Sequence, residues 1–196
     1  DIRVYDRNLN DAEIQQLANE GVNTCSAIVN IPDANFKAAL LANTAINTDG
    51  DNEICTTEAA GFSGTLDVSS LGINDLTGIE AFVNIGELNC INNNLTSIDI
   101  SNIVGLPRLF CNENQLTSLD LTQNTSLVTL GANSNQLTSL DLSQNTLLQG
   151  LSINDNQFTS LDVSQNTNLF VINCTQNQLT NIDVSGLPNL QTLNVS

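Results

Sequence analysis

The chain has 196 residues, enough for one elongated domain with a small cap, and only 4% of them are aromatic, so aliphatic side chains must make the core. It carries 21 acidic and 4 basic residues, a net charge of −17 at pH 7, which excludes nucleic acid and disfavours an anionic membrane surface as partners. Histidine is absent, so no His-based triad, general base or zinc site can form, and no apolar run is long enough to predict membrane insertion.

The first 22 residues differ from everything that follows. Ile2 and Val4 alternate with Arg3 as in a short strand, and Asn10 with Glu13 fits the capping box of a helix. The stretch resembles the closing strand and helix of a laminin-G-like, concanavalin-type domain, a family that often binds sugars. On that interpretation the fragment begins inside a longer protein. The alternative interpretation is a helical leader that docks on the cap.

Residues 23–64 are predicted to form an N-terminal cap. A helix is expected from Ile31, with Pro32 in its first turn and Phe36 and Leu40 facing inward. Of the five cysteines, Cys25 and Cys55 both lie in this region, and whether they are bridged stays open at this point.

The segment 47–58 has the spacing of a 12-residue EF-hand calcium loop. Oxygen donors fall at positions 1, 3, 5, 7 and 12, namely Asn47, Asp49, Asp51, the backbone carbonyl of Glu53, and Glu58. Asn52 occupies position 6, where the motif has glycine, and we expect the left-handed turn there because Asn tolerates it. We predict a Ca²⁺ site that stiffens the cap. The alternative is an acidic turn before a short helix at residues 58–62.

A repeat dominates residues 65–196. After a transitional repeat of 22 residues that begins at Leu66, an aliphatic residue recurs every 21 positions at Leu88, Leu109, Leu130, Leu151, Ile172 and Leu193. A regularly placed asparagine follows each of the first five. Such periodicity predicts a solenoid in which each repeat buries an apolar face against the next. The last repeat stops just after its first strand, so we expect this uncapped end to self-associate or fray.

Each repeat also contains a second register. The segments LFCNEN (109–114) and LDLTQN (119–124) obey one rule, with apolar residues at the first and third positions and asparagine at the sixth. Alternation of this kind is typical of a strand with one buried face, so we expect two short strands per coil, on opposite sides. The pattern resembles the leucine-rich repeat family, in its short 21-residue bacterial form, and the first repeat with its cap resembles internalins. The resemblance implies a mainly β solenoid with a small helical N-terminal cap.

Equivalent side chains in successive coils should form straight columns about 4.8 Å apart from rung to rung. The asparagine columns are expected to bond to the backbone of neighbouring coils (Asn114, Asn135, Asn156 and Asn177, with a partial column at Asn124, Asn145 and Asn166). Cys90, Cys111 and Cys174 occupy inward positions and are expected to be small buried hydrophobes.

One acidic column suggests a ligand stripe. It consists of Asp99, Asp120, Asp141, Asp162 and Asp183. Neighbouring carboxylates at that spacing repel by about 0.9 kcal/mol in water, so hydration with counterions, hydroxyl donors or bound cations must offset the repulsion. We consider two interpretations, a solvated charged stripe and a site for cations or basic ligands.

The other strand face carries small and amide side chains (Asn89, Phe110, Gly131, Ser152 and Asn173, beside Ile91, Asn112, Asn133, Asn154 and Thr175). It could hydrogen-bond an extended peptide or glycan. We therefore predict a non-catalytic adhesion module of a secreted or cell-surface protein that recognises protein or polysaccharide. The alternatives are an accessory module of a carbohydrate-active enzyme and a structural spacer.

Overall fold

The computed structural model describes Asn10, Cys25 and residues 27–195, so the predicted strand and helix of residues 1–22 lie almost wholly outside the described residues. The laminin-G-like resemblance therefore stays a prediction. Within the described part of the chain, no helix has both the length and the apolar character that a membrane span requires.

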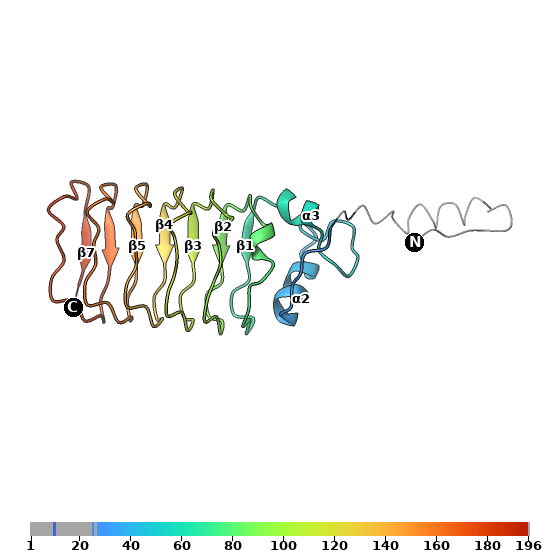
Figure 1. Cartoon of the computed structure of the whole chain (residues 1–196), viewed down its shortest axis with the longest axis horizontal. Helices are drawn as coiled ribbons and strands as arrows, with labels where there is room; N and C mark the ends of the chain where they lie inside the picture. Colours follow the sequence, from blue (N-terminus) through green and yellow to red (C-terminus); the bar gives the residue numbers. More distant parts are fainter. Residues whose placement is uncertain (1–9, 11–24, 26, 196) are drawn as a thin grey trace.

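The body of the molecule is one parallel sheet of seven strands, stacked in chain order along the long axis of the solenoid (Figure 1). The strands pair in register, with Leu109 opposite both Leu88 and Leu130. This confirms the predicted solenoid of aligned repeats. The strands are β1 (Thr65–Asp67), β2 (Glu87–Asn89), β3 (Arg108–Phe110), β4 (Thr129–Gly131), β5 (Gly150–Ser152), β6 (Val171–Asn173) and β7 (Thr192–Asn194).

The central side chain of strands β1 to β6 points into the core. Leu88, Leu109 and Ile172 are 0% exposed, as the 21-residue period predicts. In the last coil Leu193 and Val195 are exposed, because no described residue covers them. Self-association through that end stays a prediction.

The prediction of two strands per coil is wrong for the second half of the repeat. Leu119 and Leu121 are buried as expected, yet among the described residues no strand is formed in residues 115–128. The Leu121 carbonyl accepts the amide N–H of Asn124 and the side chain of Asn145 instead of a strand partner. Buried and more exposed residues therefore alternate on both sides of the coil, but strands pair into a sheet on one side only.

Two short helices and a 3₁₀ turn close the N-terminal end. They are α2 (Ala34–Ala42), α3 (Thr56–Gly61) and η1 (Ile79–Ala81). Helix α2 begins later than Ile31 because Asp33 is its N-cap, where its Oδ1 accepts the N–H groups of Asn35 and Phe36. Its buried face, Phe36 and Leu40, belongs to the same apolar core as the repeats.

Several contacts tie the cap to the first coil, and two of them are specific to single residues. The second carboxylate oxygen of Asp33 accepts the N–H of Asn74 at 2.9 Å. Gly78, at φ +105°, lies against residues 29–31, and a Cβ there would come within 2.7 Å of the Ile31 side chain. Glycine is therefore required at this close approach.

Candidate functional site

The outer face of the sheet is built from the residues that flank the buried centre of each strand. At its N-terminal part the face is charged, because Glu87 and Arg108 form an ion pair of 2.7 Å between neighbouring strands. From β4 onward its strand residues are uncharged (Thr129, Gly131, Gly150, Ser152, Val171, Asn173, Thr192 and Asn194). A surface of this kind suits a partner that hydrogen-bonds and buries modest apolar area.

A ring and a glycine make the most distinctive feature of this face. Phe110 of β3 lies over Gly131 of β4, so that a Cβ at position 131 would come within 2.9 Å of the Phe110 ring. The ring therefore packs against the backbone of Gly131 and is half-buried, on the strand that also carries Arg108 of the ion pair with Glu87.

The amide column beside the strands is partly engaged within the protein. The Asn112 Oδ1 accepts the N–H of Asn133, the Asn133 Oδ1 accepts the N–H of Asn154, and the Asn154 Oδ1 accepts the N–H of Thr175. The oxygens thus link one coil to the next. For a ligand the column offers mainly the Nδ2 groups of Asn112 and Asn133, which bond to no other described residue.

The acidic column is aligned as predicted, and each of its carboxylates is held by the residue two positions further on. The Asp120 Oδ1 accepts the Thr122 hydroxyl at 2.7 Å and the Thr122 N–H at 2.9 Å, and both lower the pKa of Asp120 below its ordinary value. The N–H and hydroxyl of Ser143 likewise lower the pKa of Asp141, against the carboxylates of its two neighbours. Hydroxyl and backbone donors therefore offset much of the repulsion that the sequence implied.

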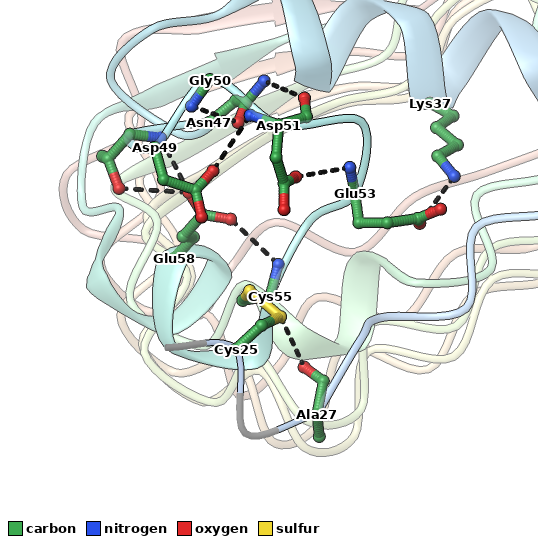
Figure 2. The surroundings of a disulfide bond; sticks show 11 residues. Cys25, Ala27, Lys37, Asn47, Asp49, Gly50, Asp51, Glu53, Cys55 and Glu58 are labelled. Carbon is green, nitrogen blue, oxygen red and sulfur yellow. Dashed lines mark hydrogen bonds and ion pairs between the residues drawn. A yellow bond between two sulfur atoms is a disulfide. The ribbon is translucent and has the colours of Figure 1, made fainter. Parts of the chain in front are cut away.

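The cap loop folds back on itself (Figure 2). Asn47 is buried, and its side chain donates to the carbonyls of Leu41 and Asp51 while its Oδ1 accepts the Gly50 N–H. The Asp49 and Asp51 carboxylates each accept the N–H two residues on. Gly50, at φ +72°, takes the left-handed conformation that we expected at Asn52, and that expectation was wrong. Glycine adopts it without the steric cost that any side chain carries.

The two glutamates of this loop have other partners. The Glu53 carboxylate pairs with Lys37 at 2.7 Å, which leaves its backbone carbonyl as the only predicted ligand atom of that residue. Burial opposes ionisation of Glu58, but donors from Cys55 and Thr48 lower its pKa below the ordinary value. Among the described residues, no three acidic or cysteine side chains gather into a group able to hold a metal ion.

The cysteines divide into one disulfide and three buried thiols. Cys25 and Cys55 are bonded, with their Cα atoms 5.2 Å apart, which fastens residue 25 to the loop (Figure 2). Cys90, Cys111 and Cys174 are free and buried, as predicted. Burial raises the pKa of Cys111 to about 12, so this thiol is neutral and unreactive at physiological pH.

Known structures share this architecture. The functional domain of InlJ from Listeria monocytogenes, described as including a cysteine ladder, is 38% identical to the chain with a TM-score of 0.78; the match covers 84% of this chain and 36% of that one. The chain has the leucine-rich repeat fold. Other leucine-rich repeat structures also match it. Internalin C2 from Listeria monocytogenes is 21% identical, with a TM-score of 0.52 and coverage of 87% and 92% of the two chains, which shows the shared fold alone.

YopM from Yersinia enterocolitica is a further match, 26% identical with a TM-score of 0.55, and the match covers 69% of this leucine-rich repeat chain and 33% of that one. No protein-family model matches the sequence, and no curated protein does. The chain spans little more than a third of the length of the InlJ domain it resembles, so the activity of any larger protein is a matter for proposal.

Two features of this leucine-rich repeat protein were not predicted. One residue per coil has a positive φ although it is not glycine, at Ser70, Asn92, Glu113, Ser134, Asp155 and Gln176. The sequence signal is that all of them except Ser70 precede a regularly placed asparagine. The other is Phe170, whose ring is exposed outside every predicted column.

Proposed function

We propose that this leucine-rich repeat chain is a non-catalytic recognition and adhesion module that binds a protein partner through the outer face of its sheet. The observation that carries the proposal is the face itself, one strand per coil in register, with the Phe110 ring held on Gly131 beside the Arg108–Glu87 pair. Stacked repeats form extended surfaces of this kind, and rigid aromatic rings beside arginine are the residues that anchor protein partners.

The matched structures support a binding role, because the internalin and YopM chains share the fold. The bond between Cys25 and Cys55 supports a secreted or surface location, since disulfides form and persist in oxidising compartments. The free thiols do not oppose this location because all three are buried.

The experiment is a binding assay on an array of purified cell-surface and extracellular-matrix proteins. Phe110→Ala should weaken binding of the protein that is captured by about tenfold or more, because hot-spot rings contribute about 2 kcal/mol. Gly131→Glu should also weaken it, by displacing the ring and adding a charge to the face.

Leu147→Ala is the matched control, since Leu147 is exposed but does not belong to strand β5. Failure of every protein to bind, or binding that survives both face variants, would reject the sheet face as the recognition surface.

We also propose that the loop 47–58 binds calcium and stiffens the cap. The support is the set of hard oxygen donors that one short loop carries, Asn47, Asp49, Asp51 and the Glu53 carbonyl. Both carboxylate oxygens of Glu58 already accept hydrogen bonds, one from Thr48 and the other from Cys55. We therefore assign Glu58 a structural role in closing the loop.

Calcium should raise the melting temperature of the protein, and Asp49→Ala with Asp51→Ala should abolish that increase. Glu58→Gln should lower the melting temperature both with and without calcium, because the carboxylate holds the loop in either state. If calcium leaves the melting temperature of the unmodified protein unchanged, the loop is an acidic turn only.

The aspartate column is a second proposed site, for cations or basic ligands. The support is that the residues two positions further on donate to Oδ1 of each carboxylate, which leaves Oδ2 to accept a hydrogen bond or bind a cation. Changing Asp120, Asp141 and Asp162 together to Asn should weaken binding of a decalysine peptide in low salt. Unchanged binding would leave the column as a solvated charged stripe.

A further inference from the structure

A groove of about 480 Å³ runs along one flank of the last three coils, just before strands β5, β6 and β7. It lies beside the outer face of the sheet and not on it, since its residues precede the strands rather than belong to them. The walls are formed by an aromatic ring, a proline and four side-chain amides (Phe170, Pro188, Gln149, Asn168, Asn189 and Gln191).

Phe170 is the feature that the fold does not explain. Its side chain is 43% exposed, whereas Phe158 is fully buried and Phe110 is packed on Gly131. Among the described residues it is the one aromatic side chain so exposed. The equivalent positions of other coils hold Pro107, Val128, Gln149 and Gln191, so the solenoid does not require a ring there.

The amides around the ring are orientated for a ligand. The Asn168 Nδ2 donates to the carbonyl of Thr146 at 2.9 Å, and the Asn189 Nδ2 donates to that of Thr167 at 3.3 Å. Each bond fixes one end of the amide and leaves its oxygen as an acceptor. The side chains of Gln149 and Gln191 bond to no other described residue, so they supply both donors and acceptors.

The groove is also neutral, although the chain carries a net charge of −17. An uncharged lining gives no selectivity for a basic peptide, a phosphate or an acidic glycan. A neutral sugar matches it well, because the C–H groups on one face of a sugar ring pack on an aromatic ring while the hydroxyls around its edge bond to amides.

We infer that this groove binds a single chain of a neutral polysaccharide, with a sugar ring on Phe170 and its hydroxyl groups on the flanking amides. The coils supply a repeating support, because Asn168 and Asn189 occupy the same position of neighbouring coils, about 4.8 Å apart. A polymer of identical units can thus place successive hydroxyls on successive rungs. This inference concerns a different surface from the sheet face and does not depend on it.

The test is affinity gel electrophoresis of the intact chain in gels that contain a soluble β-glucan, a mannan, a xylan or, as the charged comparison, polygalacturonate. At least one neutral polysaccharide should retard the protein. Phe170→Ala should reduce the affinity about tenfold, from the loss of one aromatic contact. Gln149→Ala with Gln191→Ala should reduce it by a similar factor, from the loss of two hydrogen bonds.

Two controls separate a lost contact from a lost fold. Leu71→Ala removes an apolar side chain that is 41% exposed and lies in the first coil, away from the groove, and it should leave retardation unchanged. Phe110→Ala, on the sheet face, should also leave the retardation unchanged. The test of the groove is therefore independent of the test of the sheet face. Retardation by polygalacturonate alone, by no neutral polysaccharide, or equally for Phe170→Ala and the unmodified protein would overturn the inference.

Discussion

The strand side and the opposite side of each coil both carry a buried asparagine, but the two asparagines are bonded differently. On the strand side Asn135 donates to the carbonyl of Cys111 in the previous coil, and its Oδ1 accepts the N–H of Leu116. On the opposite side Asn145 donates to the carbonyls of Leu121 and Asn124, and its Oδ1 has no partner among the described residues.

The difference shows where the coils are held together. On the strand side the sheet and the asparagine column act together, and the Asn135 oxygen is the acceptor for a buried backbone N–H. On the opposite side the sheet is absent, and the side chain of Asn145 supplies the lateral bonds that strands would otherwise make. The same residue type therefore completes a sheet on one side and replaces it on the other.

The largest effect should follow from Asn135→Ala. The substitution leaves the N–H of the fully buried Leu116 without its acceptor, so the free energy of unfolding should fall by about 2–3 kcal/mol. Urea denaturation measures this. The neighbouring exposed Gln136→Ala is the control and should change the stability by less than about 0.5 kcal/mol.

Asn145→Ala should cost less, about 1 kcal/mol. Each of the two carbonyls that it releases keeps a backbone donor, from Asn124 or from Leu127, and the substitution also removes a buried oxygen that has no partner. A loss equal to or greater than that of Asn135→Ala in the same urea experiment would show that the two sides are equally important for cohesion.

A smaller effect should appear in acid. The Asp120, Asp141 and Asp162 carboxylates have lowered pKa values when folded, so the unfolded chain takes up protons first as the pH falls. Their contribution is therefore present above the unfolded pKa and is lost as the pH falls through the folded pKa. Changing all three to Asn should reduce the difference between urea midpoints at pH 6 and pH 3; an unchanged difference would mean that other carboxylates cause the acid sensitivity.

The smallest effect should be a gain. Glu113 has a φ of +56° at the end of the strand side, a conformation that disfavours any side chain. Glu113→Gly should raise the free energy of unfolding by about 0.5 kcal/mol, since the relief of strain slightly exceeds the added flexibility of the unfolded chain. Glu113→Ala, which keeps a Cβ, should give no gain, and a thermal melt of the three proteins distinguishes them.

Several parts of the molecule followed directly from residue spacing. The positions of Leu109, Leu130 and Leu151 predicted the core, the register and the columns, because only stacking buries a face that recurs every 21 residues. The bonding of Asn135 to a neighbouring coil followed from the same alignment.

Other parts depended on distances that spacing does not contain. The spacing of Cys25 and Cys55 along the chain does not show whether they form a disulfide. The fold brings their Cα atoms to 5.2 Å, and the two residues are bonded. The EF-hand motif predicts the left-handed residue of the cap loop at its sixth position, Asn52. The structure has it at Gly50, because glycine has no Cβ and adopts this conformation without steric cost.

The sequence by itself determined which side chains are buried and in what order the coils stack, because a period records the face that is turned away from water. Only the tertiary structure decided which backbone groups meet across neighbouring coils, and so which half of the repeat is a strand. It also decided which surfaces a partner can reach, the Phe110 face and the Phe170 groove, because exposure depends on what the neighbouring coils cover.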